Sequence, residues 1–363
     1  MIKLMIGNNF EKDLIEKVIE FNKYYNKSKI VEMFGNVSST FAEYTARPLY
    51  RLPEKSLEHF NNIKQLMEDN NIILNFTMNG LNIDKTKFDK DNFIEFLKIY
   101  KIKKITVSST FLLEILQNSD LDIDIELSTI YHIESIYKMQ LLLQRYPKIK
   151  KVCMSLMKNR DFDFLIKFRK TFLNLELELM VNEFCLFQCP NRIMCYLNHQ
   201  NIKTVEESKL FNNYPMRDCI QARNTDFGEW LKTRFILPQW IHYYTDIGYD
   251  RFKITGRTAS TNFIVNVAKI YMDIIDGIEN DYSFADLWFH LENIGNNKEN
   301  KFVPNILKQI KYEDLKMFER ELFKSDGLVN YDCENRCSIH CNMCNQIAKN
   351  ILMEKKVEFK YGE

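Results

Sequence analysis

Eight short segments rich in Ile, Val, Leu and Phe alternate along the chain with segments of helical periodicity. The apolar segments end in small or polar residues, as strands that are buried on both faces do. They span residues 2–6, 29–34, 72–77, 104–107, 122–127, 150–154, 175–181 and 251–255. The helical patterns between them include residues 12–22, 56–70, 91–100, 130–145 and 163–170.

This alternation predicts an α/β fold, and the number of strands is that of a (β/α)8 TIM-like barrel. The alternative is an open doubly wound sheet, but no G-x-G-x-x-G follows the first strand, which disfavours its dinucleotide-binding form. The barrel would span residues 1–275, with a long connection between strands seven and eight. A helical extension over 276–330 follows, with helices at 284–294 and 312–323, and then a Cys-rich tail over 331–363.

Composition and charge disfavour several classes of protein. The net charge is +1, which disfavours a large nucleic-acid partner, because phosphates would favour a basic groove. We find no apolar run of the ~18 residues that a membrane span needs, and the N-terminus turns acidic too early for a signal peptide. We therefore expect a cytoplasmic protein without a membrane partner. In a large chain of this kind, nine Cys indicate metal ligands or catalytic thiols, not a disulfide framework.

Four of the Cys lie in the long connection after strand seven, namely Cys185, Cys189, Cys195 and Cys219. The loops after the strands' C-terminal ends form the active sites of such barrels. Four thiolates there could bind zinc or an iron–sulfur cluster. The alternative, four buried apolar thiols, fits poorly with their close grouping in one irregular loop.

Four more Cys lie in the tail, namely Cys333, Cys337, Cys341 and Cys344. The C-x3-C-x2-C spacing of the last three is that of a radical-SAM loop. Such a loop follows the first strand of its barrel, so we reject that interpretation. On a straight helix the four thiols would share a face but span ~16 Å. Either the segment bends around a zinc ion or a second 4Fe–4S cluster, or the thiols form a core stripe; we predict a bound centre.

The rim segment ELELMVNEFCLFQCPNR, together with Cys219 and ILPQWIHYYTDIGYDRFKITGR, resembles the collagenase-like peptidase family (peptidase family U-32). VEMFGNV, ARPLYRLP and NIILNFTMNG resemble its N-terminal half, so that the resemblance covers residues 1–275. It implies a (β/α)8 barrel. In the branch that resembles oxygen-independent hydroxylases, it also implies a 4Fe–4S cluster, prephenate as oxygen donor and, for some members, a partner protein subunit.

Residue by residue, the resemblance implies that Cys185, Cys189 and Cys219 are cluster ligands. The resemblance implies a His at the place of Cys195, so this thiol is either the fourth ligand or, if it does not bind, leaves one iron open. The chain departs from the peptidase-type pattern, in which a His-Gly pair precedes the first Cys. Asn182, Glu183 and Phe184 stand there instead, so substrates of those members do not carry over.

Several polar residues outside the Cys groups are predicted at the same rim. Lys253 and Arg257 end strand eight, where they could bind a dicarboxylate such as prephenate or form a structural ion pair. Glu183 could act as an acid/base catalyst or as a partner of the cluster. Arg257 is predicted to share this catalytic role.

Further polar residues are predicted at or after the ends of earlier strands. Glu32, at the end of strand two, is a candidate acid/base catalyst, and Asn79, after strand three, is a candidate substrate-binding residue. Asp161 is predicted to cap the helix after strand six, and Arg160 beside it to reach the substrate pocket.

These features predict a 4Fe–4S-dependent enzyme that performs oxygen-independent hydroxylation or a related redox modification of a small molecule or peptide. One alternative is a peptidase or peptide-modifying protein, although no H-E-x-x-H, G-x-S-x-G or P-loop motif supports hydrolysis. The other is a non-catalytic iron–sulfur partner subunit. Cys153, inside strand six, is predicted to be a core residue.

Overall fold

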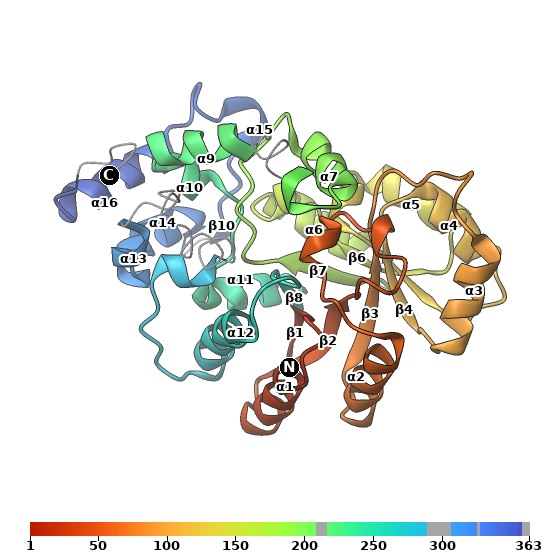
Figure 1. Cartoon of the computed structure of the whole chain (residues 1–363). Coiled ribbons are helices and arrows are strands. Elements are labelled where there is room, and N and C mark those ends of the chain that lie inside the picture. Colours follow the sequence, from red (N-terminus) through yellow and green to blue (C-terminus); the bar gives the residue numbers. More distant parts are fainter. Residues whose placement is uncertain (208–215, 289–305, 325–326, 358–363) are drawn as a thin grey trace.

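The computed structural model describes residues 1–207, 216–288, 306–324 and 327–357 (Figure 1). Eight parallel strands close into a barrel in sequence order, with β8 paired to β1. The strands are β1 (Ile2–Gly7), β2 (Ser28–Gly35), β3 (Ile73–Met78), β4 (Lys104–Val107), β5 (Asp124–Leu127), β6 (Ile149–Cys153), β7 (Glu176–Met180) and β8 (Arg251–Ile254). The predicted (β/α)8 fold is thereby confirmed.

Helices follow the strands and cover the outside of the barrel, as parallel strands require. Those after β1 to β6 are α1 (Lys12–Tyr24), α2 (Leu57–Asp69), α3 (Lys90–Ile99), α4 (Thr110–Gln117), α5 (Ile136–Arg145) and α6 (Phe162–Thr171). The long connection after β7 contains α7 (Arg192–Asn201), α9 (Met216–Thr225), α10 (Gly228–Lys232) and α11 (Ile241–Asp246), and α12 (Thr261–Asp276) follows β8.

Side-chain caps fix where several helices begin. Asp161 accepts a hydrogen bond from the backbone N–H of Phe164 (3.1 Å), as predicted for the start of α6. The pattern at 130–145 is interrupted: His132 has φ +51°, and Ser135 caps α5 by accepting from Lys138 N–H. A left-handed residue ends a helical turn, so the predicted single helix is a 3-10 turn (Thr129–Tyr131) followed by α5.

The C-terminal extension packs on one side of the barrel, away from α3–α5 (Figure 1). It contains a 3-10 turn (Phe284–Leu287), α13 (Ile306–Gln309), α14 (Tyr312–Leu322), the short strands β9 (Phe323–Lys324) and β10 (Gly327–Leu328), α15 (Cys333–Arg336) and α16 (Met343–Glu354). The helix predicted at 312–323 is α14. Of the one predicted at 284–294, residues 284–287 form the 3-10 turn, and residues 289–294 lie outside the described part.

Aromatic side chains join this extension to the barrel. Trp240, which is fully buried, contacts Phe235, Phe318 and Phe323 at ring-centroid distances of 5.4, 5.9 and 5.5 Å. Large buried aromatic rings contribute strongly to packing energy. Within the described residues, no helix has the length and apolarity that crossing a membrane would require.

Candidate functional site

The interior of the barrel holds a network of charged residues, in contrast to the apolar layers usual in such barrels. Lys151 contacts Glu32 (2.7 Å), Glu126 (3.1 Å) and Glu178 (2.5 Å). Lys253 contacts Glu126 (3.0 Å) and Glu178 (2.8 Å). These five side chains are at most 7% exposed, so each charge depends on its partners for stabilisation.

The electrostatics of the network follow from burial and pairing. Burial lowers the pKa of Lys151, but the contacts with Glu126 and Glu178 raise it well above its ordinary value. Burial raises the pKa of Glu32, but Lys151 and Lys104 outweigh this effect and leave the pKa below its ordinary value. Lys151 and Glu32 are therefore held charged inside the barrel.

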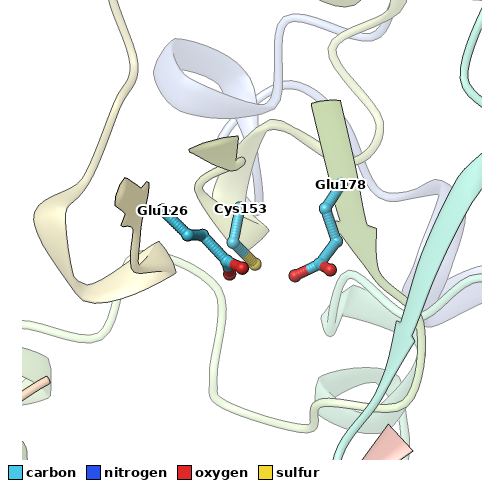
Figure 2. A group of neighbouring side chains, drawn as sticks. All are labelled: Glu126, Cys153 and Glu178. Atoms are coloured by element: carbon cyan, nitrogen blue, oxygen red, sulfur yellow. The ribbon is translucent and has the colours of Figure 1, made fainter. Parts of the chain in front are cut away.

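Glu126, Cys153 and Glu178 point toward one another from β5, β6 and β7 (Figure 2). Their ligand atoms lie within 4.8 Å of one another, which would suit a metal ion. Lys151 and Lys253 nevertheless contact both carboxylates, so an added cation would compete with two ammonium groups. Burial raises the pKa of the Cys153 thiol well above its ordinary value. This group therefore fits the predicted core position of Cys153 better than a metal site.

The network places two predicted residues more deeply than expected. Glu32 was expected at the rim, but β2 continues to Gly35, so Glu32 lies within the strand and points into the interior, 1% exposed. Lys253 is likewise tied to Glu126 and Glu178 by its ammonium group, which corresponds to the structural ion-pair alternative. Lys253 nevertheless also lines a pocket at the mouth of the barrel.

A pocket of about 740 Å³, its open mouth included, lies above this network at the C-terminal ends of the strands. Cys153 and Lys253 form part of its floor, and hydroxyl groups from several strands line its walls. Four polar residues from the loops complete it: Arg47, Asn79, Glu183 and Arg257. The structure therefore brings the predicted residues Asn79, Glu183, Lys253 and Arg257 together around one cavity.

Two guanidinium groups give the pocket a positive wall. Arg257 is 6% exposed, and its Nη2 donates to Asn79 Oδ1 (3.3 Å), while its buried Nη1 has no hydrogen-bond partner. Burial, and then repulsion by Arg47, lower the pKa of Arg257 well below its ordinary value. Asn79 Oδ1 also accepts from the N–H of Ala46, next to Arg47 (3.2 Å). Two adjacent cations and an unused donor would be stabilised by an anionic ligand such as a carboxylate.

Gly7 holds the backbone of Arg257 in place. A Cβ at Gly7 would lie 2.3 Å from the backbone N of Arg257 and 2.5 Å from its Cα. We expect Gly7→Ala to displace this segment, lower the free energy of unfolding by about 1–3 kcal/mol and weaken carboxylate binding. Urea unfolding and calorimetric titration with a dicarboxylate measure the two effects. Arg257→Ala should weaken binding without the backbone strain; unchanged stability and binding in Gly7→Ala would contradict this role.

The rim thiols lie beside the pocket. Cys185 packs against the apolar group of Cys153 and Met180, and its Sγ lies 3.8 Å from Glu183 Oε1. Burial raises the pKa of Cys185 to about 12, with Glu183 and Cys219 contributing, and burial and Cys219 raise that of Cys195 to about 11. Cys189 also acts on the pKa of Cys195. The four predicted thiols are therefore electrostatic neighbours, and Glu183, which lies next to Cys185, lines the pocket.

Buried arginines beside these thiols were missed by sequence analysis. Arg223, 2% exposed, donates to Cys219 Sγ (3.5 Å) and to the carbonyl of Phe184. Arg192, 5% exposed, lies close enough to Cys185 for the two groups to shift each other's pKa. Both lie four or fewer residues from a Cys, which was the signal available in the sequence. Their charges would offset those of bound thiolates.

Asn182 was also missed as a positioning residue. Its Oδ1 accepts from the N–H (2.7 Å) and hydroxyl (3.1 Å) of Thr255, and its Nδ2 donates to the carbonyl of Leu287 (3.0 Å). It thereby ties the end of β7 to the end of β8 and to the C-terminal extension. Its place directly before Glu183 fixes where the Cys-bearing loop leaves the barrel.

Arg160 differs from its predicted place at the substrate pocket. It is 4% exposed and donates to the carbonyls of Leu231 (2.8 Å) and Phe235 (3.4 Å). Burial, and then Arg234, lower its pKa to about 10. Arg160 lines a second cavity with the four tail thiols, because its hydrogen bonds to the carbonyls of Leu231 and Phe235 hold the side chain there and not at the mouth pocket.

Both sets of four thiols could bind a metal centre, because zinc and iron–sulfur clusters are each held by four thiolate ligands.

Among curated proteins, the chain is 27% identical over 272 residues to an uncharacterized protease of Methanocaldococcus jannaschii. The aligned residues cover 73% of this chain and 69% of that protein. No family model matches the chain.

Two solved structures show how distant the structural likeness is. A U32 peptidase superposes with a TM-score of 0.49 at 11% identity, over 70% of this chain and 92% of that chain. An N-acetylneuraminate lyase from Fusobacterium nucleatum reaches 0.38 at 12% identity, over 97% of each chain. The sequence similarity relates this chain to a protein that is named a protease.

Proposed function

We propose that the protein is an iron–sulfur enzyme of the U-32 type that binds a small carboxylate substrate at the barrel mouth and modifies it by oxygen-independent hydroxylation or a related redox reaction. One observation carries this proposal: Glu183 lines the same pocket as Arg47 and Arg257, and its carboxylate lies 3.8 Å from the Sγ of Cys185, the first of the rim thiols. A peptide with a free carboxylate would meet the same recognition groups.

The rim thiols Cys185, Cys189, Cys195 and Cys219 would hold the 4Fe–4S cluster. Such a cluster, when bound, supplies electron transfer and, where one iron lacks a protein ligand, a site for an oxygen donor. The donor set fits, because thiolates are the usual cluster ligands, and Arg192 and Arg223 lie beside them to offset their negative charge.

The pocket residues have separate roles in this proposal. Arg257 and Arg47 would bind carboxylate oxygens, and Asn79 would orient Arg257 through its hydrogen bond. A dicarboxylate such as prephenate, the oxygen donor that the family resemblance implies, would use both arginines. Glu183, half-buried and at the pocket edge, would hold or deliver a proton. Phe184 and Tyr196 line the same wall and would exclude water from it.

Anaerobic purification with iron and sulfide analysis tests the cluster. We expect about four irons per chain to be lost in Cys185→Ser and in Cys219→Ser, and to be retained in Cys153→Ala, the matched thiol outside the rim loop. Prephenate titration should show binding that weakens at least tenfold in Arg257→Gln. Iron content that is unaffected by both rim substitutions would overturn the proposal.

A peptidase remains the second candidate, since the relative with 27% identity is named a protease. Proteolysis of an unfolded protein such as casein by the purified chain, surviving Cys185→Ser, would favour it over the redox enzyme. A redox reaction that requires a second polypeptide would instead point to the partner-subunit role that the family resemblance also implies.

A further inference from the structure

The four tail thiols, which a straight helix would have spread out, are brought together by a sharp turn. Cys333 begins α15, and α16 begins beside Cys344. Between these helices the backbones of Cys337 and Cys341 pair as an isolated β-bridge, and both thiols are free. Ser338, at φ +61°, donates its backbone N–H to the carbonyl of Cys341 (3.0 Å). All four thiols line one cavity of about 450 Å³, its opening included.

Three cations from the barrel line the opposite wall of this cavity: Arg160, Lys232 and Arg234. They are 4%, 7% and 3% exposed, and the Nε atoms of Arg160 and Arg234 are buried without a hydrogen-bond partner. Lys232 forms an ion pair with Glu229 (2.5 Å), so a carboxylate already offsets its charge. The guanidinium groups of Arg160 and Arg234 line the same cavity. Buried like charges are costly unless an anion offsets them.

No acidic side chain lines this cavity; its described lining consists of the thiols, the cations and polar or apolar residues. The negative charge that offsets the arginines must therefore come from the thiols as thiolates. A centre with four thiolate ligands carries net negative charge and so matches the arginines.

The tail is fitted closely to this wall. A Cβ at Gly228 in α10 would lie 2.2 Å from Asn345 Oδ1 in α16, so the two helices approach closely. Lys158, which follows β6, pairs with Glu334 in α15 and with Asp161 (3.0 Å). Residues of the barrel side and of the tail therefore line one cavity. Helix α16 packs against α10, on the side of the barrel where the extension lies (Figure 1).

We infer that Cys333, Cys337, Cys341 and Cys344 bind a second iron–sulfur cluster, held between the tail and the buried arginines Arg160 and Arg234 of the barrel. Arg234 also connects this cavity to the rim loop. Its guanidinium lies 3.7 Å from the centre of the ring of Phe187, a residue that stands between Cys185 and Cys189 in the sequence. This inference stands independently of the proposed function, since none of its ligands belongs to the barrel mouth.

Iron analysis of the whole chain, purified anaerobically, tests the inference. In the Cys185→Ser/Cys219→Ser background we expect about four irons per chain and the electron paramagnetic resonance signal of a reduced cluster. Adding Cys337→Ser or Cys341→Ser should remove both, whereas His340→Ala, an exposed neighbour, should leave them unchanged. Circular dichroism checks that each variant is folded.

The arginines give a second readout that does not depend on loss of a ligand. Arg234→Gln should shift the midpoint potential of the remaining cluster to more negative values, because a nearby positive charge stabilises the reduced, more negative state. Stoichiometric zinc without iron in the background variant, or iron that survives both tail substitutions, would overturn the inference. Loss of iron on tail substitution but not on rim substitution would refute the barrel cluster and keep this one.

Discussion

Replacing Lys151 with Met is expected to lower the free energy of unfolding by about 3–5 kcal/mol, the cost of removing one partner from a buried ion pair. Lys151 is fully buried and contacts three carboxylates, those of Glu32, Glu126 and Glu178. Its loss would leave these charges inside the barrel with only part of their compensation. Urea unfolding followed by circular dichroism measures the change.

Two further variants show whether charge is the cause. Lys151→Met combined with Glu32→Gln should recover part of the lost stability, because one uncompensated carboxylate is removed. Lys98→Met removes an exposed pair with Asp120 (2.9 Å) and should change stability by at most ~1 kcal/mol. A Lys151→Met protein as stable as the parent chain would contradict the interior network.

Replacing Trp240 with Ala is expected to lower the free energy of unfolding by about 3–5 kcal/mol. The indole is fully buried between Phe235 of the barrel connection and Phe318 and Phe323 of the extension, so its removal leaves a cavity where the two parts meet. The extension should then become more accessible to proteases than the barrel. Urea unfolding and limited proteolysis check both effects.

Tyr137→Ala is the matched control, since this aromatic side chain is 69% exposed and its removal should change stability by at most ~0.5 kcal/mol. Unfolding of Trp240→Ala in two separate transitions would support a division near residue 275. Unchanged stability would show that the extension does not depend on this contact.

The sequence predicted the fold from local patterns. Short apolar runs followed by helical periodicity define β/α units wherever they occur, and eight units in a row close into a barrel for reasons of sheet geometry. The helix boundaries were less accurate where a single residue ended a turn, as at His132. The two sets of four Cys were also visible, because spacing along the chain is enough to group them.

The depth and direction of individual side chains were not visible in the sequence. Glu32 and Lys253 carry charges that suit a rim site, yet ion pairs across the barrel hold them in its interior. The position of Arg160 after β6 predicts a place at the mouth. Its hydrogen bond to the carbonyl of Leu231 instead holds it at the second cavity, which the tail thiols also line. Asn79, Glu183 and Arg257 do line the mouth pocket, where their substrate or catalytic roles remain predictions.

The sequence alone thus determined the alternation of eight β/α units and the two groups of thiols, because both follow from the spacing of residues along the chain. Only the tertiary structure decided which charges face the mouth, which are paired in the interior, and which arginines face the tail thiols. Those outcomes depend on contacts between residues far apart in sequence, such as Arg160 with residues 231–235, and no local pattern records them.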